Sequence, residues 1–193
     1  FEAQSEDSNI QTVFDAFWYS LVTLTTVGYG DYFPTTIYGK ILSSPLIIAS
    51  LGVLGYIIGK LSGYIRDLAE RKKMGLDGTN MKGHIIIVGW DDFSKGVVTQ
   101  LVNANKKVCV ITDDKDHLDI IYERYDKKSV FPLCMDFSSK DCLTKANIKE
   151  AVVLMPNLGD DAKNLVYILN AKKEFPHISY IVTLDNAELE ETF

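Results

Sequence analysis

A long run of apolar residues is the clearest feature of the hydrophobic pattern. Residues 41–59, ILSSPLIIASLGVLGYIIG, contain no charged side chain. A helix of this length rises about 1.5 Å per residue and covers most of the roughly 30 Å hydrocarbon core of a bilayer. The run therefore predicts a membrane-spanning helix, and a fully buried core helix of a globular protein is the alternative.

Shorter helical patterns flank this predicted span. Residues 12–24, TVFDAFWYSLVTL, are mostly apolar and aromatic, and Thr12 and Asp15 have the spacing of a capping box. This segment is too short to cross a bilayer, so we expect a buried or re-entrant helix. Residues 59–74 place apolar side chains three or four positions apart between charges, which predicts an amphipathic continuation of the spanning helix.

From residue 84 the pattern changes to short β-branched runs that alternate with helical segments. The runs are HIIIVG, KVCVIT, SVFPL, AVVLM and SYIVTL, and the last ends at Leu184. Continuous apolar strands are typical of a sheet covered on both faces, so we predict a doubly wound α/β domain. The glycine-containing linker before it predicts a membrane region over 1–80 and an α/β domain over 81–193, of which the chain contains only a part.

The charged residues are distributed as in a membrane protein. Residues 1–31 contain acidic side chains but no lysine or arginine, whereas basic residues follow the apolar run at Lys60, Arg66 and 71–73. The positive-inside rule then places everything after the span in the cytoplasm and residues 1–36 outside. Because the chain does not begin with methionine, we expect it to be part of a longer protein, with a further membrane helix upstream.

Net charge and cysteine content indicate which binding partners and which cellular compartment to expect. The formal net charge is -6, and no basic stripe appears in the C-terminal part, which argues against a nucleic-acid-binding protein. The three cysteines are an odd number without metal-ligand spacing. We interpret Cys109, Cys134 and Cys142 as reduced core thiols of a cytosolic domain.

The sequence TTVGYGD, residues 25–31, lies between the predicted short helix and the predicted span. A filter that replaces the hydration shell of an ion needs successive carbonyls aimed at one axis, and its backbone must alternate between ordinary and left-handed conformations. Glycine adopts the left-handed conformation at low cost, and Gly28 and Gly30 are two positions apart. The Thr26 hydroxyl can add a further ligand. An ordinary glycine-containing turn is the alternative.

Residues 12–66 resemble the pore helix, selectivity filter and inner helix of the tetrameric potassium channels. The resemblance implies a homotetramer in which each chain supplies one quarter of every ring of oxygens around the potassium ions. It also implies an aromatic cuff that includes Trp18 and Tyr19, with a hydrogen bond from Trp18 to Asp31. Some members have a glutamate where this chain has Val22, so control of the filter by that carboxylate is not expected. The implied potassium-binding residues are Thr26, Val27, Gly28, Tyr29 and Gly30.

Glycines recur on one face of the predicted spanning helix. Gly52, Gly55 and Gly59 are three and four positions apart. Small residues on one face allow two helices to pack closely, and this packing explains the glycines as well as a role in function does. In channels of the resembling family a glycine near the middle of the inner helix is a gating hinge, and Gly52 or Gly55 is the candidate here.

The α/β domain keeps only part of a dinucleotide-binding fingerprint. Its first strand ends at Gly89, but WDDFSKG follows, so a full G-x-G-x-x-G is absent. The second strand is followed by Asp113, about where an acidic residue would hold a ribose hydroxyl. A turn that only maintains the fold is an equal alternative for Gly89.

Residues 84–193 resemble the N-terminal lobe of the RCK family, the prokaryotic domains that regulate potassium conductance. The resemblance implies a cytoplasmic gating ring that pulls on the inner helices when calcium or an adenine nucleotide such as NAD or ADP binds. Carried over by position, Gly89, Asp113 and Asp136 would line the nucleotide cleft. The expected fold is thus an all-α potassium-channel pore followed by a Rossmann-like α/β lobe, surrounded by lipid in the plasma (inner) membrane.

Two other functions are compatible with parts of the sequence. A membrane-tethered NAD-dependent oxidoreductase would use the Rossmann-like half, but none of His84, His117 or His177 has a recognisable catalytic setting, so we do not expect an enzyme. A potassium transporter subunit is the nearer alternative. The filter loops of such transporters are degenerate and occur four to a chain, so the complete TVGYG favours a homotetrameric channel.

Overall fold

The computed structural model describes residues 2–4, 8–139 and 141–183. The chain forms two compact units, Phe1–Asp67 and Leu68–Phe193. The boundary expected from the linker composition, between residues 80 and 81, lies beyond this division and stays a prediction.

The first unit contains a short capped helix. A 3-10 turn, η1, covers Glu2–Gln4, and helix α1 covers Val13–Leu24. The Thr12 hydroxyl accepts a hydrogen bond from the Asp15 N–H (3.1 Å), and the Asp15 carboxylate accepts one from the Thr12 N–H (2.8 Å). The predicted capping box and the predicted helix are therefore both confirmed, and the cap fixes where α1 begins.

Helix α2 covers Ile37–Lys73, so the predicted span and its predicted amphipathic continuation form one helix. Among the described residues it is the one helix long and apolar enough to cross a membrane. Its apolar side chains are largely exposed within this chain; Leu42 and Leu51, for example, are each 69% exposed. A continuous exposed apolar surface of this kind needs lipid or neighbouring subunits to cover it.

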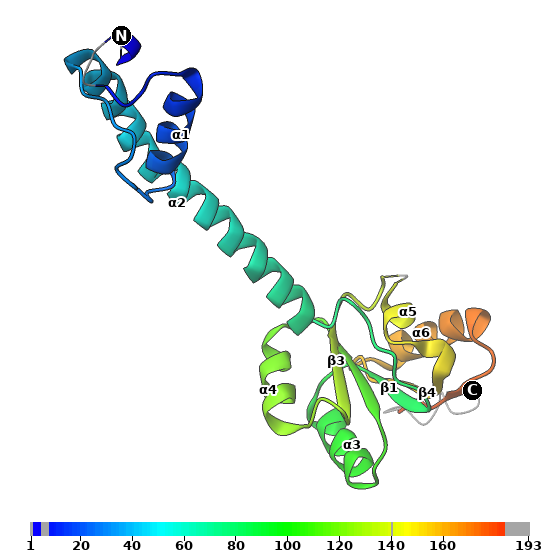
Figure 1. The fold of residues 1–193 in the computed structure, drawn as a ribbon. Coiled ribbons are helices and arrows are strands. Elements are labelled where there is room, and N and C mark those ends of the chain that lie inside the picture. The colour runs from blue at the N-terminus through cyan, green and yellow to red at the C-terminus, as the bar shows by residue number, and fades with distance from the viewer. Residues whose placement is uncertain (1, 5–7, 140, 184–193) are drawn as a thin grey trace. The chain divides into compact units, whose positions relative to one another are not determined.

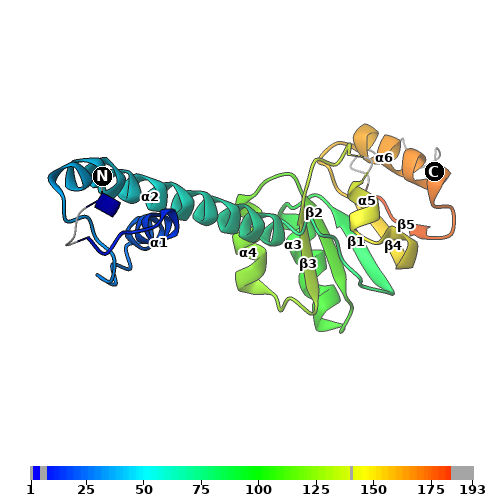
Figure 2. The same ribbon diagram turned by 45° about the horizontal axis from the view of Figure 1, so that its top comes forward.

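Five parallel strands form the sheet of the second unit, in the order β3-β2-β1-β4-β5 (Figure 2). This order reverses direction at β1, as in a doubly wound fold, and confirms that prediction. The last strand is shorter than expected among the described residues, and Leu184 lies outside them. The strands are β1 His84–Val88, β2 Val108–Thr112, β3 Val130–Cys134, β4 Ala151–Pro156 and β5 Ser179–Tyr180.

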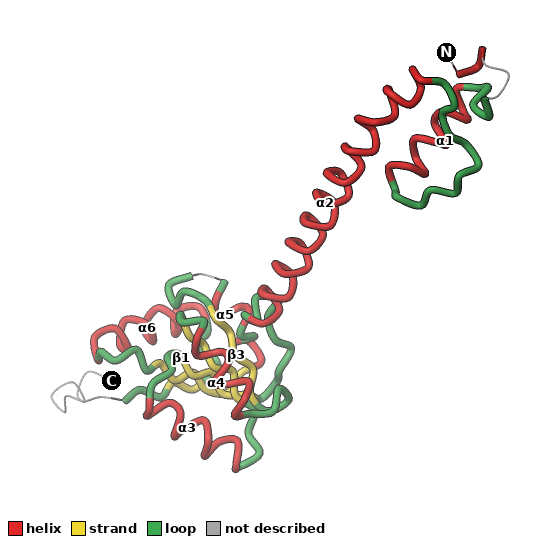
Figure 3. The backbone as a smooth tube through the Cα atoms, turned by 90° about the vertical axis from the view of Figure 1, so that its left-hand side faces the viewer, coloured by secondary structure: helices red, strands yellow, loops and turns green. Residues whose placement is uncertain are grey.

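Helices cover both faces of this sheet. Helices α3 and α4 lie on one face, and α5 and α6 lie on the other (Figure 3). Successive strand residues serve the two sides in turn: Ile86 packs in the cluster with Cys142 of α5, whereas Ile87 packs in the cluster with Val98 of α3. Both layers are apolar, which explains the continuous hydrophobic runs in the sequence. The remaining elements are α3 Asp92–Asn103, α4 Asp116–Arg124, α5 Cys142–Lys145, η2 Ile148–Glu150 and α6 Asp161–Glu174.

The three cysteines are buried and free, as predicted. Burial raises the pKa of Cys142 to about 12 and the pKa of Cys109 beyond its usual range. Burial also raises the pKa of Cys134. A thiol with a raised pKa carries little thiolate at neutral pH, so these residues act as core side chains.

Candidate functional site

The loop after α1 has an alternating backbone. Thr26, Gly28 and Gly30 have φ values of 58°, 59° and 75°, and the residues between them are not left-handed. This alternation is what a row of carbonyls along one axis requires. The positive φ of Thr26 was not predicted, because a β-branched residue rarely adopts this conformation. Such strain is found where the surrounding structure enforces a functional geometry.

Contacts with α1 support this loop. The Trp18 Nε1–H donates to Asp31 Oδ2 (2.9 Å), which is the hydrogen bond expected from the resemblance. The Trp18 ring also stacks on the Tyr29 ring, with centroids 6.3 Å apart and planes 4° apart. Tyr19 follows on α1 and is half-buried. Trp18 of α1 thus contacts two residues of the loop, Tyr29 and Asp31, which lie on either side of Gly30.

The backbone of the loop is also tied to the end of α1. The N–H groups of Val27 and Gly28 donate to the Val22 carbonyl, at 3.0 and 3.3 Å. Val22 is 7% exposed, so an apolar side chain occupies the position where some channels have a glutamate. The roles of Thr26, Val27, Gly28, Tyr29 and Gly30 as potassium ligands stay predictions, since a complete ring of ligands would need loops from several chains.

The glycines of α2 lie within an unbroken helix. A Cβ atom added at Gly52, Gly55 or Gly59 would meet nothing within 4 Å in this chain. Packing inside one chain therefore does not require these glycines. A hinge and a close contact with another subunit both remain compatible with them.

Alanine at the hinge position is expected to lower the open probability of the assembled protein. Glycine in a helix interior is about 1 kcal/mol less favourable than alanine, which corresponds to about fivefold in an equilibrium. Gly55→Ala or Gly52→Ala in every subunit should therefore stiffen α2 and reduce opening at least about fivefold. Single-channel recording measures this effect, and Gly63→Ala on the same helix is the control. An unchanged open probability in both variants would remove the hinge from the account.

The last turn of α2 is attached to the α/β domain. Lys73 Nζ forms an ion pair with Asp119 Oδ1 of α4 (2.7 Å), and the Tyr122 hydroxyl donates to the Lys73 carbonyl (2.8 Å). Glu70 forms a second ion pair, with Lys115. We call these contacts the α2–α4 clamp. Sequence patterns do not predict this clamp, because its partners are about 45 residues or more apart.

The backbone after α2 is fixed as well. The Cys134 N–H donates to the Met74 carbonyl (2.8 Å). Gly75 has φ of 72°, and a Cβ atom there would lie 2.4 Å from the Pro132 carbonyl oxygen. The end of the inner helix is therefore held against α4 and β3 without a loose segment between them.

The predicted nucleotide residues gather at one edge of the sheet. Gly89, Asp113 and Asp136 follow β1, β2 and β3, at the carboxyl ends of adjacent parallel strands. Hydrogen bonds from the Ser138 N–H (2.8 Å) and hydroxyl (2.7 Å) lower the pKa of Asp136. The reversal of strand order between β1 and β4 makes this the edge where doubly wound folds bind ligands.

The turn after β1 does not fit a dinucleotide. In G-x-G-x-x-G register from Gly89, the second and third glycines are replaced by Asp91 and Ser94. The Asp91 carboxylate caps α3 by accepting from the Ser94 N–H (2.8 Å). Asn157 directly follows β4, and its amide donates to the same Asp91 oxygen (2.7 Å). Side chains of the chain itself therefore already occupy the N-terminus of α3.

Gly89 is required by a protein contact. Its φ is 105°, and a Cβ atom would lie 2.0 Å from the Asn157 carbonyl oxygen. Gly89→Ala is therefore expected to lower the free energy of unfolding by about 2 to 4 kcal/mol. Gly96→Ala, in the open interior of α3, should be neutral or stabilising by up to about 1 kcal/mol. Thermal unfolding in detergent measures both; equal stability of the two variants would contradict the contact.

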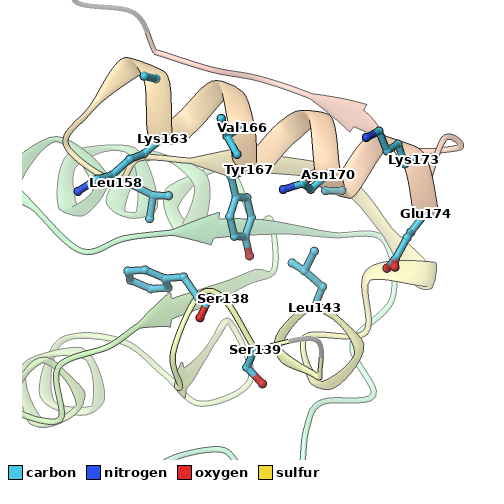
Figure 4. Close-up of a pocket in the computed structure, with 13 residues that line it drawn as sticks. Ser138, Ser139, Leu143, Leu158, Lys163, Val166, Tyr167, Asn170, Lys173 and Glu174 are labelled. Atoms are coloured by element: carbon cyan, nitrogen blue, oxygen red, sulfur yellow. The ribbon is translucent and has the colours of Figure 1, made fainter.

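A pocket of about 790 Å³ lies between α6, α5 and the loop after β3 (Figure 4). Tyr167 points into it from α6, and its buried hydroxyl has no hydrogen-bond partner among the described residues. Leu143 and Leu158 contribute apolar walls. The sequence did not predict this pocket, since it is formed by side chains from three separate segments. No group of three or more His, Cys, Asp or Glu side chains able to hold a metal ion occurs within the described ranges.

Both halves of the chain match known families. Residues 3–67 match the family described as Ion channel, and residues 85–193 match the TrkA-N domain. The second match covers more than half of the chain, which therefore belongs to the TrkA-N domain family. With the apolar helix α2, the ion-channel match identifies a membrane protein.

Curated relatives include potassium channels of archaea. Potassium channel protein 1 of Methanocaldococcus jannaschii is 32% identical over 174 residues, which are 88% of this chain and 51% of that protein. The calcium-gated potassium channel TvoK of Thermoplasma volcanium is 28% identical over 176 residues, 86% of this chain and 49% of that protein. The chain thus spans about half the length of these relatives. The predicted resemblance to prokaryotic potassium channels is confirmed.

A solved structure shares the fold. The GsuK channel bound to NAD superposes with a TM-score of 0.54 at 19% identity, over 94% of this chain and 33% of that chain. Such low identity supports the arrangement of a helical pore region followed by a parallel-sheet domain, and nothing finer. The predicted fold class is confirmed by this likeness and by the two family matches.

Proposed function

We propose that this chain is part of a potassium-selective channel subunit, with residues 25–30 as its selectivity filter. The observation that carries the proposal is the alternating backbone at Thr26, Gly28 and Gly30, between a capped short helix and a spanning helix. Four copies would place their loop carbonyls around one axis, in a homotetramer embedded in lipid. The archaeal potassium channels among the relatives support this function.

The α/β domain is proposed to control opening from the cytoplasmic side of the inner membrane. The basic residues that end α2 support this orientation by the positive-inside rule. A ring of such domains can open the pore only if a ligand binds the open arrangement more tightly than the closed one. The candidate ligand classes are calcium, because TvoK is calcium-gated, and adenine nucleotides, because GsuK was solved with NAD and with ADP. The contacts of Asp91 in the turn after β1 favour the first class over the second.

The α2–α4 clamp is the proposed connection between ligand and pore. It attaches the last turn of the pore-lining helix to α4, and the Met74 carbonyl attaches the next residue to β3. A displacement of the domain would therefore move the end of α2 directly. All of these contacts lie within the unit Leu68–Phe193.

Planar-bilayer recording of the full-length protein tests the gating half of the proposal. Calcium, NAD and ADP are added separately to the side that carries the α/β domain. A potassium current whose open probability changes with at least one of them supports ligand gating through this domain. A potassium current that ignores all three contradicts gating by these ligand classes.

A further inference from the structure

We propose that the turn between β1 and α3 is closed to nucleotide phosphates, because Asp91 already supplies the anion at the N-terminus of α3. This inference deepens the ligand gating proposed above and rests on it for its physiological meaning. It concerns one position, the helix N-terminus at which doubly wound folds hold a pyrophosphate. It assigns Asp91 and Asn157 as the residues that determine the ligand class.

The position of Asp91 is unsuited to a dinucleotide. The second glycine of the fingerprint has no side chain so that the backbone can approach the pyrophosphate closely. Here a carboxylate occupies that position and accepts a hydrogen bond from the Ser94 N–H (2.8 Å). An incoming phosphate needs the same N–H groups of the first turn of α3, so it must first displace the Asp91 side chain.

Asn157 holds the carboxylate in this place. Its amide donates to Asp91 Oδ1 (2.7 Å) and to the Ser94 hydroxyl (2.9 Å). Its own N–H donates to the Val88 carbonyl at the end of β1 (2.7 Å). Because Asn157 follows β4, these bonds cross the crevice between β1 and β4 where the strand order reverses. A dinucleotide would have to lie in this same crevice.

The negative charge of Asp91 also disfavours a phosphate at this turn. Burial raises the pKa of Asp91, but hydrogen bonds from Ser94 and Asn157 outweigh it and leave the pKa below its usual value. The carboxylate is therefore ionised at neutral pH. A phosphate bound at the same helix N-terminus would meet a like charge at close range, and the helix dipole that favours one anion is already used.

The chain offers a matched control for this site. Asp160 is the N-cap of α6, and its carboxylate accepts from the Lys163 N–H (2.8 Å), just as Asp91 accepts from Ser94. The two caps have the same chemistry, but only Asp91 lies in the fingerprint turn. Replacing either by glycine costs an N-cap only a few tenths of a kcal/mol, so both variants should fold.

Equilibrium dialysis of radiolabelled ADP and NAD against the full-length protein in detergent tests the proposal. The wild-type protein is expected to show no binding at millimolar nucleotide, and Asp91→Gly to gain at least roughly tenfold in affinity. Asp91→Asn, which removes the charge but keeps an acceptor, should gain less. Asp160→Gly should behave as wild type.

Three results would overturn the proposal: wild-type binding as tight as that of Asp91→Gly, no gain in Asp91→Gly, or an equal gain in Asp160→Gly. A bilayer recording on the same preparation separates this outcome from a failure of the proposed function. Loss of the potassium-selective current would refute the channel, whereas the dialysis result would still decide whether Asp91 excludes phosphates.

Discussion

Gly28→Ala is expected to abolish the potassium-selective current. Gly28 has φ of 59°, a conformation that costs a residue with a Cβ atom about 1 to 2 kcal/mol. This cost would recur in every subunit of the proposed tetramer. A displaced carbonyl in each subunit would disrupt a complete ring of potassium ligands. Single-channel recording in potassium should show no openings, or openings that do not distinguish potassium from sodium.

The control for this variant is Gly96→Ala, which adds the same methyl group in helix α3 without a positive φ. Size-exclusion chromatography should show the same oligomer for both variants, so that loss of current is not loss of assembly. A Gly28→Ala channel with normal conductance and selectivity would contradict the assignment of residues 25–30 as the filter.

A flexible insertion after Met74 is expected to abolish ligand control of opening while leaving ion selectivity unchanged. Three added glycines would separate the Met74 carbonyl from Gly75, which is fitted against the Pro132 carbonyl. The end of α2 could then stay in place when the domain moves. The effect of calcium on open probability, measured by single-channel recording, should fall at least about tenfold.

The same three glycines inserted after Asn105, in the turn between α3 and β2, are the matched control and should preserve the calcium effect. Exchange of the exposed pair, Glu70→Lys with Lys115→Glu, should weaken coupling only slightly, because an exposed ion pair contributes about 1 kcal/mol or less. A calcium response that survives the insertion after Met74 would show that force does not pass through the end of α2.

Local patterns predicted most of the elements. The capping box at Thr12 and Asp15 fixed the start of α1, and the charge-free run with its amphipathic continuation predicted α2. The apolar runs located the strands, since both faces of the sheet are covered. These features depend on residues close together in the chain, where period and capping chemistry act directly.

Contacts between distant segments could not be predicted in the same way. Nothing local to Asn157 indicates that its amide reaches Asp91, 66 positions earlier. The pairing of Lys73 with Asp119 and the left-handed backbone of Thr26 are likewise imposed by the surrounding structure. Gly89 and Asp113 therefore predicted a nucleotide cleft from the sequence. The contacts of Asp91 in the structure argue against binding of the nucleotide phosphates there.

The most direct test of the central claim is the reversal potential of single channels formed by the full-length protein, with potassium on one side of a planar bilayer and sodium on the other. We expect a reversal potential far toward the potassium equilibrium value, because four loops from residues 25–30 would select potassium. A reversal potential near zero, with both ions carrying current, would contradict it.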